Sequence, residues 1–272
     1  MKRCLQVALP LLLIVLLTAA ALHGLASVQT AVWPDSAGSV RDTNGKLLMD
    51  ASHSDQGYVM LCVTKPTKHA MKVRISKDST QLMYDLDNKG DWETFPLQLG
   101  SGSYTIELFE NVKGSKYSAE GKIKLKAQLN DENAAFLVPN QYVMYTSETE
   151  AAQKSDELCN GATGKAAFDI ITKFISDEFR YDFVRAATIS AHELPDVDGC
   201  YATRSGICQD LAAVMCTMLR VQGVPAKLMI GYADKYYHAW TVCVVDGKEV
   251  FFDPTAAIGA MNAKKYSVER CY

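Results

Sequence analysis

The sequence lacks the patterns that mark several common classes of protein. It contains no C-x-x-C motif, so a structural zinc site is not expected, and no D-x-D-x-D-G loop of the kind that binds calcium. Its formal net charge of −3 offers no basic surplus for binding nucleic acid. Beyond the first residues, no apolar run is long enough to span a bilayer. We therefore expect no metal, no cofactor and no nucleic-acid partner.

The chain begins with an apolar leader, and its overall composition is that of a globular protein. Apolar residues make up 48% of the 272 residues and charged residues 22%, a mix that can bury a core. Lys2 and Arg3 precede an apolar run that ends in small residues, among them Gly24 and Ala26. We interpret residues 1–26 as a signal peptide and expect a secreted or cell-surface protein. The alternative is an uncleaved leader that anchors the chain in a membrane.

Eight cysteines are present, and one of them, Cys4, precedes the apolar run of the leader. The other seven are Cys62, Cys159, Cys200, Cys208, Cys216, Cys243 and Cys271. In an exported protein such cysteines can pair, and an odd number leaves at least one thiol free or bonded to another chain. The sequence does not give the pairing. We expect Cys216 and Cys243 in the core, and a disulfide between Cys200 and Cys208 is a further alternative.

The first part of the mature chain has the pattern of an all-β domain. Residues 27–44 are polar and rich in turn formers, and we interpret them as a linker. Five β-rich stretches follow within residues 45–145, at 58–63, 71–75, 80–86, 103–110 and 120–129. Short strands separated by turn signals predict an antiparallel, sandwich-like domain. A packing or spacer role is the simpler expectation for this domain, and ligand binding is the alternative.

From residue 147 to residue 272 the pattern becomes mixed. Ser147 followed by Glu150 predicts a capping box at the start of a helix, and a second helix is expected over 164–179. Residues 180–206 are expected to be a long irregular connection, which in a compact domain is often functional. A third helix begins at Cys208, and three strands follow it. This order predicts an α+β domain.

The last two strands place a histidine beside a carboxylate. Asp246–Gly247 is a strong signal for a two-residue hairpin turn. The register of that hairpin puts Trp240 opposite Asp253, and alternation puts His238 on the same face. His238 and Asp253 then become diagonal neighbours within reach of each other.

Cys208 completes a set of residues that can carry nucleophilic chemistry. The amino end of a helix favours a thiolate, an adjacent histidine can take the proton, and a carboxylate can orient the imidazole. The main-chain N–H of Cys208 can donate to an oxyanion. Taken singly, Cys208, His238 and Asp253 are each more often structural than catalytic. Their joint occurrence is far more specific than any one of them.

Two stretches, "RSGICQDLAAVMCTMLRVQGVPAKLMIGYA" and "YHAWTVCVVDGKEVFFDPT", resemble the core of the transglutaminase-like superfamily of papain-like cysteine enzymes. The stretches "RYDF" and "LPDVDGCYATRSG" resemble the run-up to the cysteine in exported bacterial members of that superfamily. The shared features are a G-x-C at a helix start, a G-x-P turn, and G-Y, H-A-W and D-P-T strands. The resemblance covers roughly residues 147–256. It implies an α+β fold with the cysteine helix packed on an antiparallel sheet. It also implies Cys208 as nucleophile, His238 as base and Asp253 as the residue that orients His238.

The resemblance leaves part of the site and the whole of residues 27–145 without a role. Papain-like proteases supply a glutamine about six positions before the cysteine, where this chain has Ala202. Tyr201 and Gln209 are nearby alternatives for the second oxyanion donor, and the sequence does not choose between them.

The sequence therefore predicts an exported thiol acyl-transfer enzyme that works through a thioester acyl-enzyme on a protein or peptide substrate. Resolution by water would make it a cysteine peptidase or amidase, and resolution by an amine a cross-linking transglutaminase. The pattern leans slightly toward hydrolysis. Association with the cell surface or cell wall fits an exported protein. The alternative from another class is a non-catalytic cell-surface binding protein that retains the fold.

Overall fold

The computed structural model describes residues 31–38, 41–190 and 193–272. The predicted signal peptide at residues 1–26 lies outside the described residues. Residues 31–272 form one compact unit. Within the described ranges, no helix is both long enough and apolar enough to cross a membrane.

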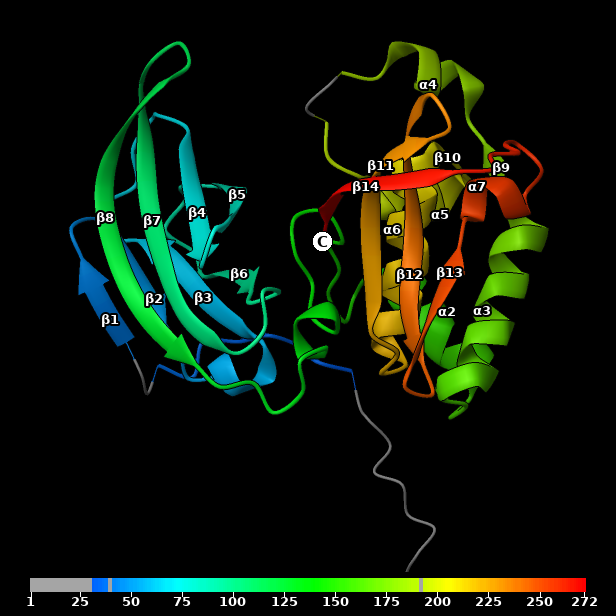
Figure 1. Cartoon of the computed structure of the whole chain (residues 1–272), viewed down its shortest axis with the longest axis horizontal. Helices are drawn as coiled ribbons and strands as arrows, with labels where there is room; N and C mark the ends of the chain where they lie inside the picture. Colours follow the sequence, from blue (N-terminus) through cyan, green and yellow to red (C-terminus); the bar gives the residue numbers. More distant parts are fainter. Residues whose placement is uncertain (1–30, 39–40, 191–192) are drawn as a thin grey trace, which may run out of the picture. The chain divides into compact units, whose positions relative to one another are not determined.

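The first part of this unit is built from two antiparallel sheets, with strand orders β1-β2-β3-β6 and β5-β4-β7-β8 (Figure 1). The strands are β1 (Arg41–Asn44), β2 (Leu47–Asp50), β3 (Tyr58–Val63), β4 (Met71–Lys77), β5 (Thr80–Leu86), β6 (Glu93–Pro96), β7 (Gly102–Lys113) and β8 (Lys116–Ala127). Inward side chains from both sheets share one core, among them Val59, Leu61, Val73, Ile75 and Ile106. The sandwich-like architecture predicted for this part is confirmed.

Three strands of the sandwich did not stand out in the sequence. They are β1, β2 and β6, and each has only four residues, too few for alternation to be visible. The strand β1 begins at Arg41, inside the segment interpreted as a linker. The boundaries drawn at residues 44 and 145 remain predictions.

The second part of the unit combines helices with another antiparallel sheet, of order β13-β12-β11-β14. The elements are α2 (Glu150–Cys159), α3 (Gly164–Glu178), β9 (Arg180–Tyr181), α4 (Phe183–Thr188), α5 (Val197–Thr203), β10 (Ser205–Gly206), α6 (Cys208–Val221), β11 (Ala226–Ala233), β12 (Tyr236–Val245), β13 (Lys248–Phe252), α7 (Pro254–Ala257) and β14 (Tyr266–Cys271). The predicted α+β architecture is confirmed.

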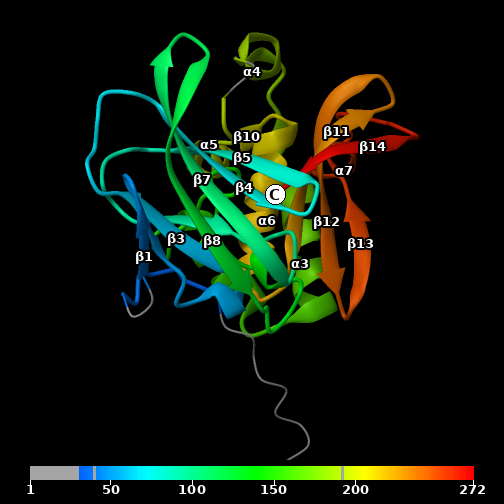
Figure 2. The same cartoon turned by 60° about the vertical axis from the view of Figure 1, so that its left-hand side comes forward.

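Helix α6 is the centre of this second part. It lies against β11 and β12, and α2, α3 and α5 pack around it (Figures 1 and 2). Residues 210–221 are all buried, so the helix is covered on every side rather than along one stripe. Even Arg220 is fully buried, because its guanidinium donates to the main-chain oxygens of Val138, Ala226 and Tyr272. The nucleophile candidate thus starts the most enclosed helix of the chain's described part.

The predicted capping box at Ser147 is wrong. Helix α2 begins at Glu150 and its N-cap residue is Thr149, whose side chain makes no capping hydrogen bond. Instead, the Thr149 hydroxyl accepts a hydrogen bond at 3.0 Å from the N–H of Thr146. The turn before the helix therefore uses the hydroxyl that the helix end would otherwise have used.

The expectation of an irregular connection over 180–206 is also wrong in part. The segment contains α4 and α5, and β9 pairs in parallel with β10. Each short helix begins after an aspartate that caps it: Asp182 accepts from the N–H of Arg185 at 2.8 Å, and Asp196 accepts from the N–H of Gly199 at 2.9 Å. These helices have six and seven residues, so apolar periodicity could not reveal them.

Candidate active site

Cys208 is the first residue of α6, and a close approach of the backbone fixes its position. A Cβ atom placed on Gly206 would lie 2.6 Å from Sγ of Cys200 and 2.9 Å from Cβ of Asp210. Only glycine fits there without movement of its neighbours. This is a physical reason for glycine at this position of the G-x-C motif. The Cys208 side chain is half-buried.

Asp210 holds the turn that leads into α6. Its carboxylate accepts hydrogen bonds from the N–H of Ile207 at 3.1 Å and of Asp196 at 3.0 Å, and from Nε of Arg185 at 2.9 Å. The side chain is 1% exposed. A buried carboxylate with three donors ties α4 and the start of α5 to the first turn of α6. The segment before Cys208 is therefore anchored at several points.

His238 lies between Cys208 and Asp253. Its Nε2 is 2.9 Å from Oδ2 of Asp253, and both side chains are almost completely buried. A carboxylate oxygen can only accept, so Nε2 carries the proton of this hydrogen bond. That leaves Nδ1 as the nitrogen for the Cys208 side chain, with which His238 also forms a hydrogen bond. The structure thus brings together the three residues predicted from the sequence.

The hairpin register was predicted correctly as far as the hairpin extends. The pairing runs from Val245 opposite Lys248 to Thr241 opposite Phe252. There β13 ends, so the expected pairing of Trp240 with Asp253 does not form. The reason is that Asp253 caps α7: its Oδ1 accepts from the N–H groups of the next two non-proline residues, at 2.9 and 3.2 Å.

Tyr266 is a member of the site that sequence reasoning missed. Its hydroxyl donates to Oδ2 of Asp253 at 2.7 Å, the same oxygen that faces His238. Its ring packs edge-on against Trp240, with ring centroids 5.1 Å apart. Tyr266 lies on β14, which the hairpin argument did not include. No local signal in the sequence connects it to Asp253.

The charges of the site favour a protonated His238. Burial by itself lowers the pKa of this imidazole, but hydrogen bonds to Asp253 and Cys208 and their negative charges raise it to about 9. For Asp253, burial raises the pKa, but the hydrogen bonds from His238 and Tyr266 and the nearby imidazolium charge bring it below its ordinary value. Asp253 is therefore ionised beside an imidazolium at neutral pH.

Both residues considered for the second oxyanion donor make other contacts in the structure. The amide nitrogen of Gln209 donates to the carbonyl of Glu193 at 3.0 Å. Tyr201 is buried, and the guanidinium of Arg204 covers its ring at 3.7 Å from the centroid.

Tyr181 is a third polar residue beside the main chain of Cys208. The parallel pairing of β9 with β10 sets Tyr181 beside Gly206, two residues before Cys208. The main-chain N–H of Cys208 donates to the Tyr181 hydroxyl oxygen, and burial together with the negative charge of Cys208 raises the pKa of Tyr181 to about 12. Tyr181 therefore remains a protonated hydroxyl at neutral pH, next to the main chain of the candidate nucleophile.

All seven cysteines of the described part of the chain are free thiols. Cys200 and Cys208 therefore do not form the disulfide that would block the nucleophile. Cys216 and Cys243 are fully buried, as predicted. Cys271 is half-buried, and burial raises the pKa of its thiol to about 11. Cys208 and Cys271 both line the cavity described next.

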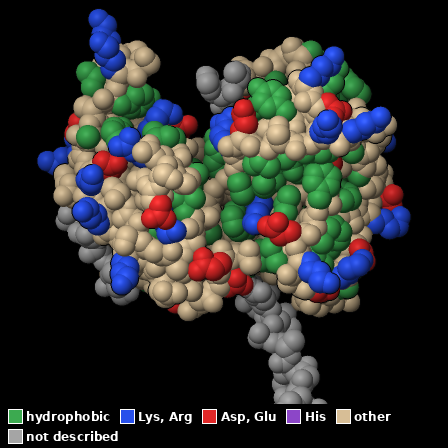
Figure 3. Space-filling view, viewed as in Figure 1, with side chains coloured by type: hydrophobic (Ala, Val, Ile, Leu, Met, Phe, Trp, Pro, Cys, Tyr) green, Lys and Arg blue, Asp and Glu red, His purple; other side chains and the backbone are tan. Residues whose placement is uncertain are grey.

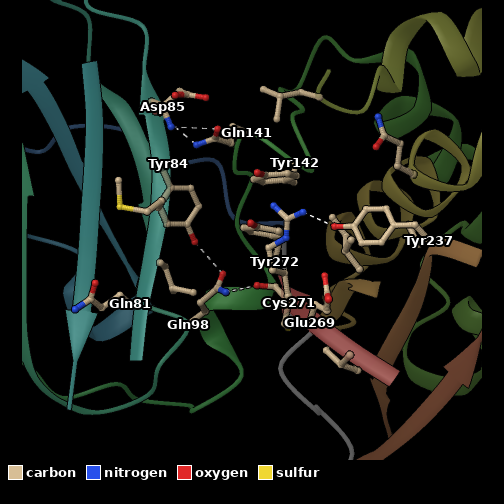
Figure 4. Close-up of a pocket in the computed structure, with 18 of the residues that line it drawn as sticks. Gln81, Tyr84, Asp85, Gln98, Gln141, Tyr142, Tyr237, Glu269, Cys271 and Tyr272 are labelled. Carbon is tan, nitrogen blue, oxygen red and sulfur yellow. Dashed lines mark hydrogen bonds between the residues drawn. The ribbon is translucent and has the colours of Figure 1, made fainter. Parts of the chain in front are cut away.

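Cys208 and His238 open onto a cavity of about 670 Å³. Its other walls come from β5, β14 and the segment around Gln141 and Tyr142 (Figure 4). Figure 3 shows the hollow in the surface, with hydrophobic side chains on part of its wall. The volume suits a drug-sized molecule or a few residues of a peptide. Within the described ranges, no group of three or more histidine, cysteine or acidic side chains is arranged to hold a metal ion.

This arrangement of Cys208, His238 and Asp253 is the one that the resemblance implied, and a comparison with known families agrees with the resemblance. Residues 151–254 match the family model of the transglutaminase-like superfamily. The matched segment contains Cys208, His238 and Asp253. The resemblance of this segment to the transglutaminase-like superfamily, seen in the sequence, is confirmed. A comparison with curated proteins gives no match.

Three solved structures match this chain at low similarity. One is a candidate cysteine protease from Cytophaga hutchinsonii, with 13% identity over 86% of this chain and 92% of that one, and a TM-score of 0.39. The second is a candidate protease from Parabacteroides distasonis, with 13% identity over 71% of this chain and 39% of that one, and a TM-score of 0.35. The third is red sea bream transglutaminase, with 12% identity over 73% of this chain and 48% of that one, and a TM-score of 0.32. This chain thus spans less than half of the second and third structures.

Proposed function

We propose that the protein is a thiol acyl-transfer enzyme in which Cys208 is the nucleophile, His238 the base and Asp253 the residue that orients His238. The observation that carries the proposal is the position of His238. It is bonded to Asp253 through Nε2 and faces Cys208 at the wall of the cavity. The transglutaminase-like match over 151–254 supports an enzyme with this chemistry.

The proposed reaction begins when the sulfur of Cys208 attacks the carbonyl carbon of an amide. The thiol proton already lies on Nδ1 of His238 in the thiolate–imidazolium pair, and the imidazolium gives it to the departing amine as the C–N bond breaks. The oxyanion of the tetrahedral intermediate would meet the main-chain N–H of Cys208 and the hydroxyl of Tyr181. The product of this half-reaction is a thioester on Cys208.

Acylation by a small activated ester tests the proposal without knowledge of the substrate. Attack of Cys208 on 4-nitrophenyl acetate would form an acetyl thioester and release 4-nitrophenolate. We expect a burst of one nitrophenolate per protein, an acetyl group on the Cys208 peptide, and no burst from the Cys208→Ala variant. An equal burst from that variant would refute the assignment of the nucleophile.

The same experiment separates hydrolysis from cross-linking. Water gives acetate from the thioester, whereas an added primary amine such as dansylcadaverine gives an acetylated amine. We propose hydrolysis as the main route, toward which the sequence pattern leans slightly. Acetylated amine as the main product at millimolar amine would reverse this assignment in favour of a transglutaminase.

We also propose that the protein acts outside the cytoplasm, on a protein or peptide at the cell surface. The support is the pattern of residues 1–26, with Lys2 and Arg3 before an apolar run that ends in small residues. Sequencing the amino terminus of the protein from its native cells tests this proposal. A start near residue 27 is expected for a cleaved leader, and a start at residue 1 would support the membrane-anchored alternative.

A further inference from the structure

The cavity that Cys208 and His238 reach has a free sheet edge as part of its wall. Strand β5 is the last strand of its sheet, pairs only with β4, and lines the cavity from Thr80 to Asp85. Figure 4 shows β5 on one side of the cavity and Tyr237, Glu269 and Tyr272 on the other. An edge strand presents a row of unpaired N–H and C=O groups to whatever lies beside it.

The register tells which main-chain groups of β5 face outward. A two-residue turn joins β4 to β5, so that Lys77 pairs with Thr80 beside the turn. Such a pair is hydrogen-bonded, and bonded and non-bonded pairs alternate from there. Gln81, Met83 and Asp85 therefore belong to non-bonded pairs. Their N–H and C=O groups point away from β4.

Gln141 provides independent evidence for this orientation. Its side-chain amide bonds to both outward groups of Asp85: Oε1 accepts from the N–H at 3.3 Å, and Nε2 donates to the C=O at 3.5 Å. An amide on a two-point bond to a strand edge occupies the place of a residue in an added strand (Figure 4). The corresponding groups of Gln81 and Met83 have no partner within the described part of the chain.

The charged side chains around the cavity do not favour a substrate of one sign. Lys72 forms an ion pair with Asp85 at 2.6 Å, and Arg270 donates to the hydroxyl of Tyr237. Glu269 adds a negative charge on the opposite wall. With charges of both signs present and partly paired, the free backbone edge is the feature best suited to bind a peptide.

We propose that the substrate is an extended peptide that adds as a strand to the β5 edge, bonds to the main chain of Gln81 and Met83, and leads its scissile or acyl-donor amide to Cys208. This inference rests on the proposed function of Cys208. It gives the sandwich a role in substrate binding rather than that of a spacer. Because main-chain bonds carry the binding, the recognition tolerates many sequences, and side chains at alternate positions add selectivity.

Peptidyl chloromethyl ketones test the proposal through the rate at which they alkylate Cys208. The thiolate displaces chloride, a C–S bond forms, and the rate reports how well the peptide is held. The alkylation rate of the acetyl-tetraalanyl reagent divided by that of the acetyl-alanyl reagent, called the tetraalanyl-to-alanyl ratio, isolates the contribution of the three additional residues. We expect the longer reagent to react at least about tenfold faster, since each hydrogen bond contributes roughly fivefold.

Two variants locate that contribution on the sheet. Met83→Pro removes an outward N–H and leaves the bonds to β4 intact, a substitution that edge strands tolerate. We expect it to lower the tetraalanyl-to-alanyl ratio about fivefold, the contribution of one hydrogen bond. Lys124→Pro is the matched control at the opposite edge, on β8, where the N–H of Lys122 points outward to the Asn44 side chain and that of Lys124 points the same way. It should leave the ratio unchanged.

Tetraalanyl chloromethyl ketones that carry one N-methyl group, each at a different residue, test the same binding mode in the protein without substitutions. In a strand added to β5, only alternate N–H groups face the edge, so N-methylation should slow alkylation at every second residue. A ratio near one, equal effects of the two proline variants, or N-methyl effects without alternation would overturn the β5 site. If instead iodoacetamide labels Cys208 no faster than Cys271, the proposed function itself has failed, and this outcome is read independently of the peptide ratio.

Discussion

The two carboxylate oxygens of Asp253 have different partners: Oδ1 caps helix α7, and Oδ2 bonds to His238 in the candidate site. Oδ1 accepts the N–H groups that begin α7, and Oδ2 faces Nε2 of His238 at 2.9 Å. The helix cap fixes the carboxylate in one orientation, and the second oxygen then fixes one tautomer of His238. The position of the base is thus set by the end of β13 rather than by the sheet pairing itself.

Asp253→Asn tests whether the two oxygens have these separate roles. An asparagine oxygen can still cap α7, but the loss of charge removes the support for the His238 imidazolium. We expect the nitrophenolate burst rate to fall about a hundredfold or more, with the melting temperature nearly unchanged. Tyr266→Phe is the matched comparison, because it removes one hydrogen bond to Oδ2 and keeps the charge; it should cost about threefold to tenfold. Equal losses in the two variants would contradict the assignment of Asp253.

Tyr181→Phe tests the proposed oxyanion contact. The variant removes the hydroxyl beside the main chain of Cys208 and keeps the ring in place. Alkylation by iodoacetamide forms no oxyanion, whereas acylation does. We expect acetylation by 4-nitrophenyl acetate to slow by about tenfold to a hundredfold, with the iodoacetamide rate within about twofold of the unmodified protein. A parallel fall in both rates would point to a general disturbance of Cys208.

Gly206→Ala tests the close approach before the nucleophile. The added Cβ would lie 2.6 Å from Sγ of Cys200, so we expect a loss of about 1–3 kcal/mol in the free energy of unfolding. Adding Cys200→Ala should recover part of this loss, and urea denaturation of the four proteins of the cycle measures the coupling. Additive effects of the two substitutions would show that Cys200 is not the obstacle.

The pKa of His238 makes a prediction about stability and pH. The folded-state pKa of about 9 lies above the unfolded value of 6.5, so the folded chain binds this proton more tightly. The stabilisation is fully present below pH 6.5 and is lost as the pH rises through 9. We expect the difference in unfolding free energy between the unmodified protein and His238→Gln to shrink between pH 6.5 and pH 9.5. A difference that grows over this range would contradict the assignment.

The sequence predicted the parts of the site that depend on local rules. Asp246–Gly247 adopts positive φ at both residues, 49° and 76°, as a type I′ turn requires, and this turn set the correct register of β12 against β13. The place of Cys208 at a helix start was likewise readable. The family resemblance supplied their roles as proposals.

The parts that could not be predicted depend on long-range contacts. Tyr266 reaches Asp253 from a strand that pairs with β11, and Tyr181 reaches Cys208 through a two-residue parallel bridge. Neither contact leaves a pattern in the local sequence. The wall that β5 gives to the cavity is a third example, because it joins residues more than a hundred positions apart.

The most direct test of the account is the labelling rate of each thiol in the non-reduced protein by iodoacetamide at pH 6, followed by peptide mapping. Cys271 is the internal control, because it lines the same cavity and is also half-buried. The account predicts that Cys208 reacts far faster than Cys271 and that His238→Ala removes the excess. Equal rates at the two thiols, or an excess that survives His238→Ala, would contradict a thiolate–imidazolium pair.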